Sequence, residues 1–255
     1  MKKTKVIIPA LGLLLLSTAA SVTGTVAWFA ANSSVTATGM KVKAKSDNEF
    51  LQIAAASATW NDTDPFTTVE INNTTAKEIK PTHVAASLAE GGASYTNYAG
   101  STSAIVWLDA RSNNVANAAH SGAFTNVTAS ATTDYTLLNE LKVRIKPGTA
   151  ASASNFRVSS VAFAAVEQSG TDVTDGLINS LRVLVVGADA GVVWKNGSYV
   201  EGATNSIVDA EVDTTGANVS VYVYFDGEDE SCYTNNAITP DDYTVSITFA
   251  VGALA

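Results

Sequence analysis

The sequence predicts an all-β protein, built as a sandwich or a barrel, and three observations support this. Thr, Ser, Asn, Ala and Val dominate a chain in which only 15% of the residues are charged, a composition that favours extended segments over long helices. Apolar and polar residues alternate with a period of two in many stretches. Clusters of Asn, Gly, Asp and Ser separate these stretches. Many short strands joined by such turns are typical of sandwiches and barrels.

Residues 1–27 have the pattern of a signal peptide. Lys2, Lys3 and Lys5 precede an apolar run over 6–16, and small residues follow it, so we expect cleavage after Ala27. The run is shorter than the roughly 20 apolar residues that span a membrane, and an uncleaved anchor remains the alternative. We therefore expect one domain, residues 28–255, that is secreted and stays extracellular or at the cell surface.

The mature chain is expected to open with its first strand. From Val35 onward polar and apolar residues alternate, and Met40, Val42 and Ala44 make the clearest apolar face. Residues 28–34 form a lead-in that contains an aromatic pair. The candidate residues for contacts between copies of the chain are Trp28, Phe29, Val35, Met40 and Val42.

Later strands show the same alternation. The clearest stretches are 142–147, 156–166, 180–187, 219–227 and 242–251. In the fourth, Val219, Val221, Val223 and Phe225 share one face, while Ser220, Tyr222 and Tyr224 share the other, which predicts a sheet with one dry side.

The strongest local signal is a hairpin over 192–200. Asn196 and Gly197 stand between two β-rich arms, and this pair favours a tight type I′ turn.

Two stretches have a helical composition. The first is 74–90, interrupted by Pro81, and the second is 174–183, where Thr174 could cap a short turn before a strand. We expect both as connections at the sandwich edges. Residues 60–130 have the weakest pattern and are predicted to form a loop-rich insertion on one core.

The charge of the chain excludes two classes of partner. It has 15 Lys and Arg against 24 Asp and Glu, a net charge of −9, which becomes about −12 once the lysines of residues 1–27 are removed. Such a charge repels nucleic acid and anionic lipid, so contact with a membrane is expected only through the signal peptide.

No catalytic or cofactor motif is visible in the sequence. His83 and His120 lack partners at metal-ligand spacing and are expected on loops. A Ser/His/Asp triad stays open because its members meet only in space, but no Gly-x-Ser-x-Gly elbow or phosphate-binding loop occurs. Cys232 is the single cysteine, so the chain has no intramolecular disulfide. Neighbouring acidic residues disfavour its thiolate form, and we interpret this cysteine as structural. We therefore expect a protein that is not an enzyme.

The acidic turn 226–230 is a weak candidate for calcium. Asp226, Glu228 and Asp229 supply oxygen ligands, and Asp241 and Asp242 could join them from a second loop. The alternative is a solvated turn after a strand.

Two scattered patterns concern saccharides. The aromatic residues Tyr95, Tyr98, Trp107, Trp60 and Trp194 could stack on sugars but share no strand face, so core packing is the default. The Asn-x-Ser/Thr pattern occurs at Asn32, Asn61, Asn72, Asn73, Asn126, Asn196 and Asn218, which indicates surface loops more than glycans.

Three segments together resemble exported proteins of the TasA/camelysin family. They are TVAWFAANSSVTATGMKVKA (25–44), LLNELKVRIKPG with GLINSLRVLVVG (137–148 and 176–187), and the C-terminal stretch from 219 to 251. The resemblance implies a jelly-roll-like sandwich with 137–148 and 176–187 as paired core strands, and export through a dedicated signal peptidase. It also implies assembly into biofilm matrix fibres, in which the N-terminal segment of one subunit inserts as a strand into the next. Camelysins are described as metalloproteases, but the zinc-ligand set is missing here.

The function expected from these observations is a structural subunit of a cell-surface or extracellular fibre. Its partner would be further copies of itself, with matrix or glycan partners in addition. The alternatives are an exported adhesin or carbohydrate-binding module that uses residues 60–130, and a secreted hydrolase.

Overall fold

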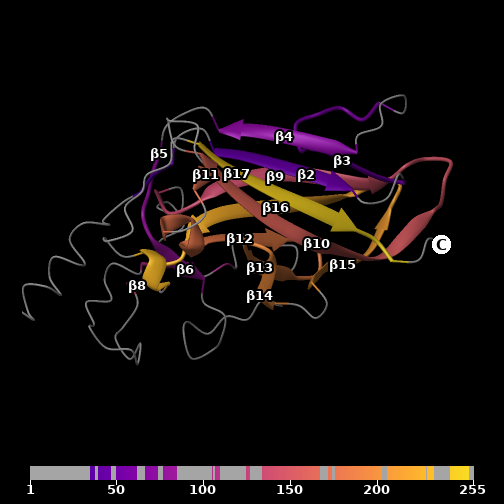
Figure 1. Ribbon diagram of the computed structural model, residues 1–255. Helices are drawn as coiled ribbons and strands as arrows, with labels where there is room; N and C mark the ends of the chain where they lie inside the picture. Colours follow the sequence, from indigo (N-terminus) through magenta and orange to yellow (C-terminus); the bar gives the residue numbers. More distant parts are fainter. Residues whose placement is uncertain are drawn as a thin grey trace, which may run out of the picture.

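The computed structural model shows an all-β sandwich in which two six-stranded sheets pack face to face (Figure 1), as the sequence predicts. The finer jelly-roll assignment stays a prediction. The structure describes residues 35–37, 40–46, 50–61, 67–73, 77–84, 105, 107–109, 125–126, 134–166, 172–173, 176–202, 206–227, 229–232 and 242–252.

The first sheet contains strands from both ends of the chain. Its order is β11-β10-β17-β2-β4, with β15 also paired to β10. The strands are β2 (Met40–Ser46), β4 (Thr68–Asn73), β10 (Ser152–Val166), β11 (Asp172–Val173), β15 (Ile207–Asp213) and β17 (Asp242–Ala250). The pairs are antiparallel apart from β17 and β2, which run parallel and so join the two ends of the chain inside one sheet.

The second sheet is antiparallel, in the order β14-β13-β12-β16-β9-β3. Its strands are β3 (Leu51–Ala55), β9 (Leu137–Ile145), β12 (Leu181–Val186), β13 (Gly191–Lys195), β14 (Ser198–Gly202) and β16 (Ala217–Phe225). The expectation that β9 and β12 pair with each other is wrong, because β16 lies between them and pairs with both.

The core lies between the two sheets and follows the predicted alternation. Met40, Val42 and Ala44 of β2 are buried, which confirms the apolar face expected for this strand. On the opposite sheet, the four apolar residues of β16 from Val219 to Phe225 point into the same core. The rings of Phe156 and Phe249 stack between β10 and β17 with centroids 5.2 Å apart.

The second face of β16 is also buried, so the prediction of one dry side is wrong for this strand. Tyr222 and Tyr224 are only 4% and 2% exposed. The ring of Trp107 lies 5.5 Å from the first and 5.2 Å from the second. Trp107 belongs to a small sheet of β6 (Thr82–Val84), β7 (Trp107–Asp109) and β8 (Thr125–Asn126), which therefore covers this face.

The first predicted helical stretch is wrong and the second is right in part. Within 74–90 the structure has two strands, β6 and β5 (Lys77–Ile79), and β5 pairs with β1 (Val35–Ala37). Strands of three residues are too short to show a period. Within 174–183 the short helix η5 (Gly176–Ser180) directly precedes β12, as expected, while Thr174 lies outside the described residues.

The hairpin between β13 and β14 is confirmed, but its turn is not type I′. That turn needs positive φ at both central residues, and only Gly197 has it, at 67°. Asn196 is held differently, because its Oδ1 accepts a hydrogen bond of 2.9 Å from the Phe163 N–H. The Gly197 N–H also donates to the Val161 carbonyl at 2.9 Å, so the turn is attached to β10 of the other sheet.

Strands form most of the described part of residues 60–130. β4 belongs to the first main sheet and carries Val69 and Ile71 against the core. β5 to β8 form the smaller sheets. Within the described ranges, no helix combines the length and the apolar character needed to cross a membrane.

Candidate functional site

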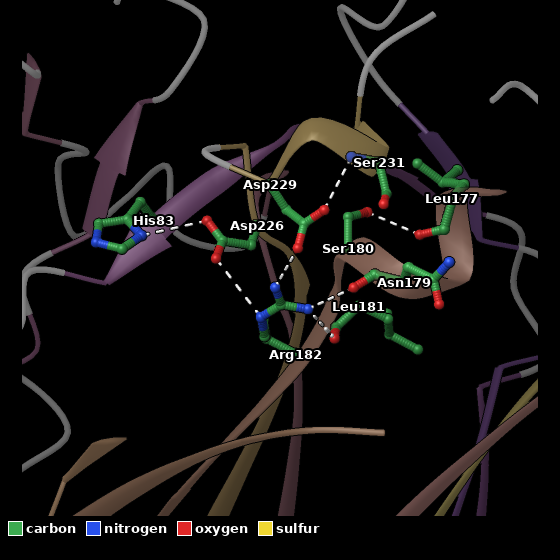
Figure 2. A network of polar contacts seen from close by, with 9 residues as sticks. All are labelled: His83, Leu177, Asn179, Ser180, Leu181, Arg182, Asp226, Asp229 and Ser231. Carbon is green, nitrogen blue, oxygen red and sulfur yellow. Dashed lines mark hydrogen bonds and ion pairs between the residues drawn. The ribbon is translucent and has the colours of Figure 1, made fainter. Parts of the chain in front are cut away.

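A polar cluster fills the space where β12 begins and β16 ends (Figure 2). We call it the Arg182 cluster, and its members are His83, Ser180, Arg182, Asp226, Asp229, Ser231 and Cys232. They come from β6, η5, β12, the end of β16 and the short helix η7 (Glu230–Cys232).

Main-chain hydrogen bonds bring these elements together. The Asp226 N–H donates to the Ser180 carbonyl at 2.8 Å, and the Gly227 N–H donates to the Thr82 carbonyl at 2.9 Å. Asp229 then starts η7, because its Oδ1 accepts a 2.8 Å hydrogen bond from the Ser231 N–H. This is the geometry of an Asp that caps a helix N-terminus.

Arg182 is the centre of the cluster, and its side chain is 7% exposed. One terminal nitrogen donates to Asp229 Oδ2 at 2.5 Å, and Nε lies 3.5 Å from Asp226 Oδ2. The other terminal nitrogen donates to the carbonyls of Asn179 and Leu181, at 2.6 and 2.9 Å. A buried guanidinium needs such partners, because removing a charge from water is costly unless it is paired and hydrogen-bonded.

The charge of Asp229 is stabilised against its burial. Burial alone would raise the pKa of the carboxyl, but the Ser231 N–H and the Arg182 guanidinium together hold it below its usual range. Asp229 is therefore ionised at neutral pH and forms a true ion pair with Arg182.

His83 lies on strand β6 and not on the loop that we expected. Its Nδ1 lies 3.2 Å from Asp226 Oδ1, and the two side chains are 12% and 16% exposed. A carboxylate in this position orients an imidazole ring. His120 lies outside the described residues.

The cluster lacks an activated nucleophile among its described members. Burial raises the pKa of Cys232 to about 12, and Asp226 and Asp229 act in the same direction. The Ser180 hydroxyl donates to the Leu177 carbonyl at 2.7 Å. The contacts of the Arg182 cluster are thus those of an internal clamp that joins two short helices to three strands.

Two of the three calcium candidates do lie together. Asp226 and Asp229 face the same point, but the positive charge between them is the guanidinium of Arg182. Glu228 and Asp241 lie outside the described residues, and Asp242 begins β17. In the described part of the chain, no three His, Cys, Asp or Glu side chains gather as they would to hold a metal ion. Calcium binding stays a prediction.

The candidate subunit contacts lie along the first strands. Met40 and Val42 are fully buried in β2, between β17 and β4. Val35 begins β1 and is paired with Ile79 of β5. Trp28 and Phe29 lie outside the described residues.

The pairing of β2 is continuous on both edges. Val42 lies opposite Val245 on one side and Ile71 on the other. On the outer face, Lys43 Nζ is 3.4 Å from Glu70 Oε2. β2 therefore contributes to the core and to both of its neighbouring strands.

The described aromatic candidates do not form one platform. Trp60 lies against Lys142 and Arg144, whose charged ends are 4.8 and 4.5 Å from the centroid of its ring. Trp107 covers β16, and Trp194 belongs to β13. Tyr95 and Tyr98 lie outside the described residues.

Sequence reasoning missed Arg182 although a signal was present. It is the one charge within the apolar strand 181–186. A charge in a strand that is buried on both faces must have a partner, and the acidic turn 226–230 is one group of carboxylates in the sequence that could supply it.

The fold and the cluster define an all-β sandwich protein with a buried ion-pair network and a terminal strand inside its first sheet. Comparisons with protein-family models, with curated proteins and with solved structures find no match.

Proposed function

We propose that the protein is an exported structural subunit of a cell-surface or extracellular fibre, and that β2 joins one subunit to the next. The observation that carries this proposal is the place of β2. It is the first strand of the sandwich, and it occupies an inner position of a sheet between strands that are distant in the sequence.

The slot that holds β2 accepts the same strand from any copy of the chain. Met40, Val42 and Ala44 fill the core, and main-chain hydrogen bonds to β17 and β4 hold the strand in register. A strand from a second copy makes identical contacts, so exchange costs little free energy once the slot is open.

The connection after β2 determines the geometry of such an exchange. β2 ends at Ser46 and β3 begins at Leu51 in the other sheet. The five Cα–Cα steps from Ser46 to Leu51 span at most about 17 Å, so exchanged subunits would stand in direct contact. Each subunit donates one strand and receives one, and this head-to-tail arrangement extends into a filament when the rotation between subunits does not close a ring.

Two further features support an exported structural role. Residues 1–27 have the pattern of a signal peptide, and the chain has a single cysteine, which is buried. We also propose that the strands of the sandwich are connected as in a jelly roll.

Paired cysteines across the β2–β4 seam test the exchange. Lys43 and Glu70 face each other and are half exposed, so Lys43→Cys and Glu70→Cys place two thiols opposite each other. Both changes are made in a Cys232→Ala background. The two single variants are mixed, unfolded, refolded together under fibre-forming conditions and oxidised. We expect a covalent dimer of the two variants on a non-reducing gel, and a covalent ladder from the double variant.

The control uses a pair of opposed residues that exchange does not separate. Ser154 of β10 faces Glu211 of β15, and mixed Ser154→Cys and Glu211→Cys variants should give no covalent dimer. A double variant of Lys43 and Glu70 that links only within one chain would overturn strand exchange. Such a monomer would favour the adhesin or binding module.

A further inference from the structure

A groove of about 680 Å³ opens where β10, β13, β14 and the start of β15 meet. Its volume lies in the range of small-molecule sites, about 300–1,000 Å³. The side chains that bear on its chemistry are Asn155, Arg157, Ser159, Trp194, Tyr199 and Ser206. The strand β2 does not line it, so the groove is separate from the proposed subunit contact.

The walls of the groove are fixed by contacts between the two sheets. The turn at Asn196 and Gly197 is hydrogen-bonded to Phe163 and Val161 of β10, which holds the β13–β14 hairpin beside that strand. Trp194 and Tyr199 face each other within the hairpin, with ring centroids 6.1 Å apart and planes at 75°. The aromatic wall is thereby held against the polar wall.

Backbone strain is concentrated in this groove. Asn155 and Ser206 have φ of 55° and 58°, and they are the residues other than glycine with positive φ in the described part of the chain. Both line the groove, on either side of the irregular pairing at Phe156 and Arg157. Such conformations are uncommon outside glycine and gather at functional sites.

The aromatic wall of the groove is made by Trp194 and Tyr199. Trp194 is 7% exposed, and its indole N–H finds no acceptor among the described residues. The nitrogen itself is buried, so a ligand in the groove would lie against the ring of Trp194, and the N–H serves as a reporter of that contact. Tyr199 is 42% exposed and presents its ring to solvent. An aromatic face beside polar groups suits the ring of a sugar, which has an apolar C–H face and a rim of hydroxyls.

The charge of the groove favours an acidic sugar over a neutral one. Arg157 lies in its wall, and none of the described residues that line it is acidic, although the chain has a net charge of −9. A guanidinium binds a carboxylate through two parallel hydrogen bonds. Asn155 and Ser206 supply neutral groups for hydroxyls. We propose that this groove binds a uronic-acid unit of an acidic polysaccharide.

Titration with an oligogalacturonate and with a neutral gluco-oligosaccharide of equal length tests this proposal. The indole N–H signal of Trp194 is identified in a nitrogen–proton correlation spectrum by its loss in Trp194→Phe. We expect the acidic oligosaccharide to shift that signal in a saturable manner and to bind about tenfold more tightly than the neutral one, the gain of one charged pair.

Variants separate the site from a general charge effect. Arg157→Gln should remove the preference for the acidic sugar, and Tyr199→Ala, at a half-exposed position, should weaken binding of both sugars. Lys195→Gln is the matched control, since it removes the same charge from an exposed position of the same hairpin outside the groove. Equal loss in Lys195→Gln and Arg157→Gln would overturn the proposal. The absence of a shift at millimolar sugar, or equal affinity for both sugars, would overturn it too.

Discussion

Arg182 donates a hydrogen bond of 2.5 Å to Asp229, and this pair holds the end of β16 against the beginning of β12. The two residues are 47 positions apart and both side chains are largely buried. The pair connects the two strands at the end where the short helix η5 leads into β12 and the short helix η7 follows β16.

Arg182→Met should lower the free energy of unfolding by about 3 kcal/mol, because it leaves Asp226 and Asp229 buried without their cation. Lys80→Met is the control. Lys80 pairs with Asp134 at 3.0 Å, but the side chains are 31% and 53% exposed. Its loss should cost less than about 1 kcal/mol. Urea unfolding of both variants checks this, and equal costs would contradict a buried pair.

Asp209 should make the protein less stable as the pH rises from about 4 to 6. Burial raises the pKa of this carboxyl to about 6, and the neighbouring Asp189 adds to the effect. An Asp of the unfolded chain titrates near about 3.9. Between these values the folded state holds a proton that the unfolded state has lost, so raising the pH favours unfolding. The contribution of Asp209 to the stability of the folded state is therefore complete below about pH 4 and lost above about pH 6.

Asp209→Asn isolates this effect. We expect the difference in unfolding free energy between the protein and the variant to change with pH only across that interval. A difference that is constant from pH 4 to 7 would show that Asp209 titrates normally.

Tyr243→Phe should stabilise the protein by about 1 kcal/mol. Tyr243 is fully buried, and its hydroxyl has no hydrogen-bond partner among the described residues. Burial alone raises the pKa of this hydroxyl. Removing an unsatisfied buried polar group recovers its desolvation cost. Thermal unfolding should show a higher Tm for Tyr243→Phe and no change for Tyr199→Phe, at a 42% exposed ring. A lower Tm for Tyr243→Phe would mean that the hydroxyl is bonded.

Cys232 should resist alkylation in the folded protein. It is 3% exposed, and burial raises the pKa of its thiol to about 12. At about pH 8 its thiolate fraction is lower than that of a free cysteine by about a thousandfold. Mass spectrometry after iodoacetamide should find the thiol unmodified in buffer and modified in concentrated guanidinium. Rapid modification in buffer would contradict the buried position.

The sequence patterns predicted the long strands well and the short ones poorly. In β2 and β16 the alternation identified the residues that point into the core, because burial of one face imposes a period of two. Tyr222 and Tyr224 were assigned to a wet face because the strands that cover them are two or three residues long and carry no pattern.

The candidate site was predictable only in its acidic half. Asp226 and Asp229 were identified because they lie three positions apart in one acidic turn, whereas Arg182 and His83 reach them through the fold. The parallel pairing of β2 with β17 likewise has no local signal, because it depends on contacts between the chain ends.

The parallel pair β2–β17 also determines how the sandwich responds to tension. The N-terminal end of β2 and the C-terminal end of β17 lie at opposite ends of one ladder of hydrogen bonds (Figure 1). A pull on these two ends slides the strands past each other and loads the rungs of the ladder together. An antiparallel pair pulled from adjacent ends would instead open one rung at a time. The N-terminal end of β2 and the C-terminal end of β17 are thus joined in shear, the geometry in which a β-ladder bears the most force.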